Sequence, residues 1–206
     1  MMSISSKIVQ DINAMKELGL VSLVFFYHDY SEDQKRGIRG LLSSALSQLC
    51  DQSDAYYDEL SKFYSKSHNG AQTASNGELA GCLKTMLGLP RQAPIYLIID
   101  ALDECPNTSK TPSPRSPREE VLRFIKEIID LPLTNLRVCV TSRPEADIKV
   151  TLEPFIFRSI SLHDERGQTE DIENYIKSYV NTRMQKWEQE TRDSVIDVLT
   201  KRAGGM

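Results

Sequence analysis

Three acidic residues lie at the end of an apolar run near the middle of the chain and just after it. In the stretch IYLIIDALDEC, Asp100 ends the run, and Asp103 and Glu104 come three and four residues later. A carboxylate fixed at the end of a strand can hold a Mg²⁺-bound water, and Mg²⁺ bridges the β- and γ-phosphates of a nucleotide. The further acids could orient or deprotonate an attacking water. Taken alone, the pattern is explained equally well if Asp103 caps a turn and Asp100 merely ends a strand.

A second apolar run ends in residues suited to phosphate. In LRVCVTSRPEADI the run is followed by Thr141, Ser142 and Arg143. A hydroxyl at this position can sense a γ-phosphate or its water, and a guanidinium can bind phosphate oxygens through two hydrogen bonds. The alternative is that Arg143 forms a surface salt bridge before a proline turn. Because ligands collect outside the carboxyl ends of parallel strands, two such ends together favour a phosphate site.

The elements that would position these residues alternate along the chain. Short apolar runs predict buried strands at 21–27, 95–99, 136–141 and 157–162. Helical spacing of apolar residues predicts helices at 4–18, 38–49, 56–64, 75–87 and 116–131, and two more within 168–203. Strands that alternate with helices imply right-handed crossovers, so all four strands are expected to lie parallel in one sheet. The predicted fold class is α/β.

Local signals mark the ends of several helices. Ser75 with Glu78, and Ser116 with Glu119, have the spacing of capping boxes. Gly19 follows the first predicted helix as a C-terminal cap. Between these helices, the Pro- and Ser-rich segment 106–118 is too polar to pack, and it is predicted to be a mobile loop.

Composition narrows the possible functions. The chain has 206 residues and a net charge of −4, whereas a nucleic-acid-binding domain usually carries a basic face, so no nucleic-acid partner is predicted. The four cysteines lack a paired spacing, so a zinc site is not expected. The apolar runs are too short to cross a bilayer and the first residues contain no apolar signal segment. We therefore expect no membrane partner and a cytoplasmic location.

The two motifs resemble those of a known family. IYLIIDALDEC is similar to the Walker B segment of NACHT-type NTPases, and LRVCVTSRPEADI resembles their sensor-1 strand. SISLHDERGQTEDIENYI and LTKRAGGM are similar to the segments that follow in fungal NACHT proteins. These proteins belong to the STAND class of signal-transduction NTPases, which includes heterokaryon-incompatibility proteins and nephrocystin-like N-terminal domains. The resemblance covers nearly the whole chain.

The resemblance implies a P-loop NTPase-like three-layer sandwich that acts as a switch driven by ATP or GTP with Mg²⁺. Asp100 would be the metal ligand, Asp103 and Glu104 would activate water, and Arg143 would sense the γ-phosphate. With Thr141 and Ser142, which follow the second apolar run, Asp100 and Arg143 would lie against the nucleotide.

The sequence also departs from this family. The family's first strand and its G-x-x-x-x-G-K-S/T loop should lie just before a helix like 4–18, and the sequence contains no such loop. We therefore expect residues 1–165 to form an incomplete NACHT core without the first strand and P-loop. Residues 166–206 would form a helical segment that leads towards a missing winged-helix region.

Two functions remain open on this basis. The first is a fragment of a nucleotide-dependent switch in which nucleotide binding and hydrolysis are weak or lost. The alternative is a non-catalytic interaction module that keeps the fold and binds another NACHT protein or an effector.

Overall fold

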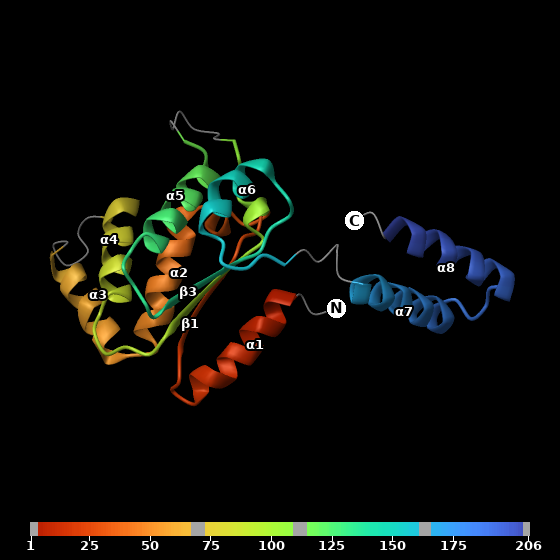
Figure 1. Cartoon of the computed structure of the whole chain (residues 1–206), viewed down its shortest axis with the longest axis horizontal. Helices are drawn as coiled ribbons and strands as arrows, with labels where there is room; N and C mark the ends of the chain where they lie inside the picture. The colour runs from red at the N-terminus through yellow and green to blue at the C-terminus, as the bar shows by residue number, and fades with distance from the viewer. Residues whose placement is uncertain (1–3, 67–72, 109–114, 161–165, 204–206) are drawn as a thin grey trace. The chain divides into compact units, whose positions relative to one another are not determined.

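The computed structural model describes residues 4–66, 73–108, 115–160 and 166–203. The chain divides into two compact units, Met1–Phe155 and Ile156–Met206. The first unit contains a sheet with helices around it, and the second contains a pair of helices (Figure 1).

Three of the four predicted strands form one parallel sheet. They are β1 (Ser22–Tyr27), β2 (Ile95–Asp100) and β3 (Leu136–Val140), in the order β1-β2-β3. Each neighbouring pair is parallel and in continuous register. β2 is therefore central, and it is mostly buried, as its unbroken apolar sequence predicts.

The fourth predicted strand, 157–162, is wrong for the residues that the structure describes. Residues 157–160 are not in a strand, and Phe157 is fully exposed at 104%. Residues 161 and 162 lie outside the described residues. A strand exists only where its N–H and C=O groups find a neighbouring strand, and an apolar local sequence cannot supply that neighbour.

The helices of the first unit lie on both faces of the sheet. In chain order they are α1 (Ile4–Glu17), α2 (Ile38–Cys50), α3 (Asp54–Lys66), α4 (Asn76–Leu87), α5 (Pro117–Ile129) and α6 (Ala146–Leu152). α1 lies against β1 and β2 on one face, whereas α2 and α5 lie on the opposite face (Figure 1). The fold class is therefore α/β, as predicted. α6 was not predicted from the sequence.

The main core fills the space between the sheet and helices α2, α4 and α5. Alternate strand residues point into it because successive side chains point to opposite faces of a sheet. The core-facing strand residues include Val24, Phe26, Ile95, Leu97 and Ile99, while Leu23 and Ile98 are buried on the other face. This packing holds β2, and with it Asp100, in a rigid position.

The predicted helix signals are present. Ser75 and Glu78 form a capping box at the start of α4, and Ser116 and Glu119 form one at the start of α5. Gly19 has a φ of 70°, and the N–H of Leu20 bonds back to the carbonyl of Met15 at 3.1 Å, as in a Schellman motif.

The Pro- and Ser-rich segment is described only at its ends. Residues 109–114 of the predicted loop lie outside the described residues. Pro117 and Arg118, which the prediction placed at the end of that loop, form the first turn of α5.

The second unit contains the two predicted C-terminal helices, α7 (Arg166–Arg183) and α8 (Gln189–Ala203). They pack against each other, and the rings of Tyr175 and Tyr179 stack along α7 with their centroids 6.1 Å apart. Within the described ranges, no helix has both the length and the apolar character needed to cross a bilayer.

Candidate functional site

The chain turns sharply where β2 ends. Ala101 adopts a left-handed conformation with φ 53° and ψ 47°, which costs a non-glycine residue on the order of 1 kcal/mol or more. A short 3-10 helix, η3 (Leu102–Glu104), follows directly. Leu102 is fully buried, and its N–H donates to the carbonyl of Thr141 at 3.0 Å. This anchor fixes Asp103 and Glu104 beside the end of β3, and we call residues 101–105 the acidic turn.

A side-chain hydrogen bond ties Asp100 to Thr141. The Thr141 hydroxyl donates to Asp100 Oδ1, and the same hydroxyl oxygen accepts the N–H of Ala101 at 3.1 Å. The N–H of Thr141 also continues the sheet by donating to the carbonyl of Ile99 at 2.9 Å. The ends of β2 and β3 are therefore held together at the point where the first predicted carboxylate lies.

A second link joins Asp103 to Arg143. The backbone N–H of Arg143 donates to Asp103 Oδ1 at 3.0 Å, and Arg143 Nε lies 3.4 Å from Asp103 Oδ2. The Asp103 side chain is only 10% exposed, whereas that of Arg143 is 80% exposed. The carboxylate is thus fixed, and the guanidinium stays free to reach a ligand in solvent.

The two remaining predicted site residues, Glu104 and Ser142, make different contacts. Glu104 Oε2 accepts the N–H of Tyr30 at 3.3 Å, which connects the acidic turn to the segment after β1. The Ser142 hydroxyl instead donates to the carbonyl of Arg143 at 2.9 Å and is exposed. The structure therefore brings Asp100, Asp103, Thr141 and Arg143 together and leaves Ser142 beside them.

Sequence reasoning missed His28, which follows β1. Its backbone N–H donates to the carbonyl of Asp100 at 3.0 Å, and its buried ring donates through Nδ1 to the carbonyl of Lys35 at 3.0 Å. Burial lowers the pKa of His28, while the Lys35 hydrogen bond and the charge of Asp103 act in the opposite direction. Nε2 is buried with no hydrogen-bond partner in the described part of the chain. The strand-end rule, applied to the first strand as well, would have pointed to this residue.

Sequence reasoning also missed Arg118, the second residue of α5. Its side chain is 7% exposed and lies beneath the acidic turn. Arg118 precedes Val121, Leu122 and Ile125 at steps of three, four and seven, so it belongs to the buried face of the helix. A charged residue in an apolar stripe is the sequence signal that could have identified it.

The carboxylates of the site provide few ligands for a metal. Across the described ranges, no cluster of three or more His, Cys, Asp or Glu side chains is arranged to hold a metal. Asp100 Oδ1 accepts the Thr141 hydroxyl. Mg²⁺ usually takes one or two carboxylates and fills its shell with water and phosphate oxygens. Among the described residues Asp100 is therefore part of no protein-only metal site, and a Mg²⁺ held there would need water and phosphate oxygens to complete its shell.

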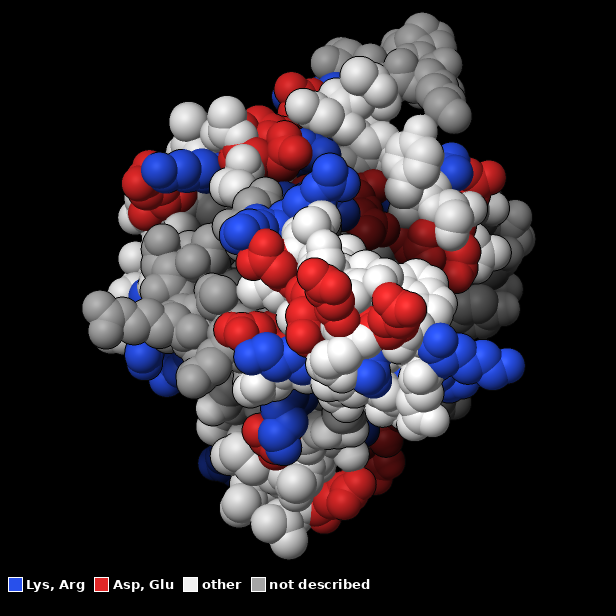
Figure 2. Space-filling model, turned by 90° about the vertical axis from the view of Figure 1, so that its right-hand side faces the viewer, with Lys and Arg blue, Asp and Glu red and all other residues white. Residues whose placement is uncertain are grey.

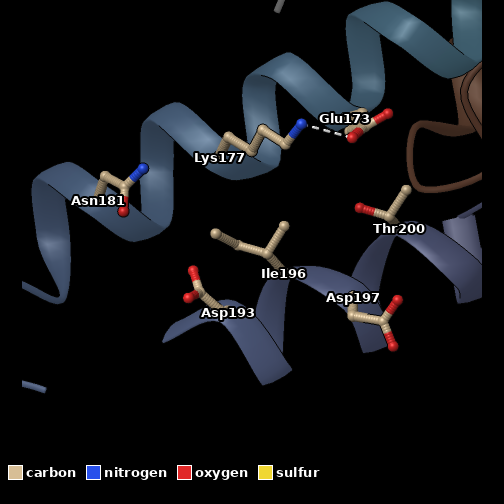
Figure 3. A pocket seen from close by; sticks show the side chains of 7 residues that line it. All are labelled: Glu173, Lys177, Asn181, Asp193, Ile196, Asp197 and Thr200. Carbon is tan, nitrogen blue, oxygen red and sulfur yellow. Dashed lines mark ion pairs between the residues drawn. The ribbon is translucent and has the colours of Figure 1, made fainter. Parts of the chain in front are cut away.

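The second unit contains a separate, open hollow between α7 and α8 (Figure 3). It is lined by Glu173, Lys177, Asn181, Asp193, Ile196, Asp197 and Thr200. Its one ammonium group, on Lys177, lies 2.5 Å from Glu173 Oε1. None of the predicted site residues lines this hollow, and its excess of carboxylates does not suit a phosphate.

Charges of both signs lie close together on the surface. Figure 2 shows acidic and basic side chains interspersed on the face that it presents. Several ion pairs join residues one turn apart within the same helix. Examples are Lys177 with Glu173 in α7 and Lys201 with Asp197 in α8.

Comparison with known proteins adds one finding. The family model described as "Nephrocystin 3, N-terminal" matches residues 3–143, a span that contains all three strands and ends at Arg143. No curated protein and no solved structure matches the chain. The matched span exceeds half of the 206 residues and includes both strand ends of the site. The chain belongs to the nephrocystin 3 N-terminal family.

Proposed function

We propose that this chain is part of a NACHT-type signal-transduction NTPase, a switch driven by ATP or GTP, and that it carries the metal and γ-phosphate side of the nucleotide site. The observation that carries the proposal is the double link between two strand ends. Asp100 is bonded to Thr141, and Asp103 is bonded to Arg143. Acidic and phosphate-binding groups from distant parts of the sequence thereby converge on one edge of a parallel sheet, where such folds bind ligands.

Each side chain has a role that fits its environment. Asp100 would hold Mg²⁺, with water and phosphate oxygens completing the metal's shell. Asp103 and Glu104 would orient the attacking water, since both carboxylates are already held by backbone N–H groups. Arg143 would move from Asp103 to the γ-phosphate, because its guanidinium is 80% exposed and the described residues hold it by a contact of 3.4 Å. Ser142 is exposed beside Arg143, and its contact with nucleotide stays a prediction.

The strength of binding is expected to be low for this sequence. A P-loop surrounds the phosphates with backbone N–H groups and a lysine, and no G-x-x-x-x-G-K-S/T stretch occurs here. A hydrogen bond to a charged group contributes about 1.5–3 kcal/mol, so losing two would weaken binding by roughly two to four powers of ten. We therefore propose weak nucleotide binding and hydrolysis no faster than background.

One observation favours the alternative, a non-catalytic interaction module. β3 has an apolar sequence apart from Arg137, yet none of its five residues is fully buried. In the described part of the chain β3 pairs only with β2, so its outer edge has unpaired backbone groups that a partner protein could bind. Such a partner could be another NACHT protein or an effector.

A nucleotide titration separates the two proposals. A fluorescent ATP analogue with Mg²⁺ is titrated into the full chain, and phosphate release from ATP is followed in parallel. Asp100→Ala and Glu104→Gln are the test variants, and Asp58→Ala, an exposed change on α3, is the matched control. We expect a dissociation constant on the order of millimolar that rises several-fold in Asp100→Ala and not in the control.

Three outcomes would change this conclusion. Binding in the micromolar range would show that another segment replaces the P-loop. Phosphate release that both test variants abolish would show the same. No effect of Asp100→Ala on any measurable binding would contradict the nucleotide site and favour the interaction module.

A further inference from the structure

A buried guanidinium lies directly beneath the acidic turn. Arg118 Nη2 donates to the carbonyl of Asp103 at 2.6 Å, and Nε donates to the carbonyl of Cys105 at 2.9 Å. The backbone N–H of Arg118 donates to the carbonyl of Pro106 at 3.0 Å. One residue therefore satisfies three carbonyls that lie on both sides of Glu104. The planar guanidinium holds its N–H groups in fixed directions, so Nε and Nη2 bond two of these carbonyls at once.

The other end of the guanidinium is held by acids from α6 and the residue before it. Arg118 Nη1 lies 3.3 Å from each carboxylate oxygen of Asp147, and 3.8 Å from Glu145 Oε2. These acids balance a charge that would otherwise be unfavourable in a buried position. They also fix the direction in which the guanidinium points.

The same acids belong to the segment that carries Arg143. The N–H of Glu145 donates to the carbonyl of Arg143 at 2.8 Å, and Arg143 in turn bonds to Asp103. A closed ring of contacts therefore runs from Asp103 through Arg143 and Glu145 to Arg118, and back to Asp103. The acidic turn after β2 and the segment after β3 are therefore joined twice. Asp103 and Arg143 join them directly, and Arg118 joins them through its contacts with both.

We propose that Arg118 is a positioning residue that sets the geometry of the acidic turn relative to Arg143. This inference rests on the proposed function, since the acids it positions, Asp103 and Glu104, are those proposed to orient the attacking water. Arg118 touches neither metal nor nucleotide. It acts through the Asp103 and Cys105 carbonyls, and it holds the short 3-10 helix that follows the left-handed Ala101.

The test uses NMR on the full, ¹⁵N-labelled chain. The first measurement is amide exchange at Glu104 and Cys105, whose N–H groups bond to the carbonyls of Ala101 and Leu102 at 2.9 and 3.1 Å. The second is line broadening by Mn²⁺ with ATP, which reports where the metal lies. The variants are Arg118→Met, Arg118→Lys and Asp147→Asn. Arg123→Met, an exposed arginine of α5 that is 56% exposed, is the matched control.

We expect Arg118→Met to speed exchange at the two turn amides by about tenfold or more while the β2 amides stay unchanged. Mn²⁺ broadening at residues 100–104 should weaken or spread in this variant and remain in the control. A purely structural role would instead raise exchange in β2 as well. Arg118→Lys should resemble Arg118→Met, because the single nitrogen of an ammonium group cannot occupy the three positions from which Nε, Nη1 and Nη2 contact the two carbonyls and Asp147. Asp147→Asn should show a smaller change in the same direction.

The outcomes for the two proposals differ. If the wild-type chain shows no localised Mn²⁺ broadening, the proposed nucleotide site fails, and turn exchange still decides the role of Arg118. If Arg118→Met does not fold, Arg118→Lys and Asp147→Asn decide it. Turn exchange and broadening equal to wild type in the folded variants would overturn the inference.

Discussion

The two edges of the sheet differ in how their backbone groups are satisfied. At the outer edge of β1, Gln52 Oε1 accepts the N–H of Leu23 at 2.8 Å and Nε2 donates to its carbonyl at 2.7 Å. Gln48 does the same for Phe25, at 3.0 and 2.8 Å. Two side-chain amides therefore bond alternate residues of β1, as a neighbouring strand would.

The outer edge of β3 has no such cover. The N–H of Thr141 and the carbonyl of Asn135 bond to β2, so the residues at even positions direct their backbone groups outward. Of these, the Leu136 carbonyl accepts Arg137 Nη1 at 3.0 Å. Among the described residues no strand pairs with this edge, and Val138 and Val140 are only partly buried.

The sheet therefore has one closed edge, at which side chains bond the backbone of β1, and one open edge, at β3. α2 and the residues just after it close β1, because their glutamines lie at the right spacing to reach every second residue. Nothing comparable lies beside β3 in the described part of the first unit. β3, the strand with the open edge, leads directly into Thr141 and Arg143 of the candidate site.

Removing the closed edge should have the largest effect. The double variant Gln48→Leu with Gln52→Leu removes the four hydrogen bonds to the outward backbone groups of Leu23 and Phe25. At about 1 kcal/mol each, the free energy of unfolding should fall by roughly 4 kcal/mol. Urea denaturation measures this change. Gln10→Leu, an exposed glutamine of α1, is the control, and an equal loss in both proteins would contradict the role of the two amides.

Proline substitutions test the open edge directly. Val138→Pro removes an N–H that faces away from β2, whereas Cys139→Pro removes one that faces β2. We expect Cys139→Pro to lower the free energy of unfolding by about 2 kcal/mol more than Val138→Pro does. Equal losses would mean that the N–H of Val138 has a partner. Denaturation of the two variants side by side measures the difference.

The smallest effect is expected at the carboxyl end of β1, where His28 is buried. Burial lowers the pKa of this residue from 6.5, so folding favours the neutral ring. Its contribution to stability is present above pH 6.5 and is lost as the pH falls towards the folded pKa. The free energy of unfolding should therefore decrease on acidification, by at most about 1.4 kcal/mol per pH unit.

Denaturation of wild type and His28→Gln at pH 6.5 and below measures the contribution of the His28 ring to the free energy of unfolding. The variant should lose less stability than wild type as the pH falls. The same slope in both proteins would show that other groups cause the dependence.

Much of the fold could be predicted because the relevant signals are local. The runs that became β1 and β2 are almost wholly apolar, which suits strands covered on both faces, and the run that became β3 is apolar apart from Arg137. Ser75 and Ser116 predicted helix starts because a capping box involves residues only three apart. The acids after β2 and the Thr-Ser-Arg after β3 could be assigned to one edge because parallel strands end on the same side.

The two failures have different causes. The strand predicted at 157–162 depended on a partner strand, and pairing is decided by residues far away in the sequence. α6 is only seven residues long, too short for its apolar spacing to stand out.

By itself, then, the sequence determined the α/β class, the helix starts and the acidic and basic residues that end β2 and β3. Only the tertiary structure decided which groups meet. Gln48 and Gln52 bond to β1 residues that lie more than twenty positions earlier in the chain. Arg118 contacts both Asp103, which precedes it in the chain, and Asp147, which follows it. Such contacts depend on how elements pack, and a side chain's direction in space is set by that packing and not by its neighbours in the chain.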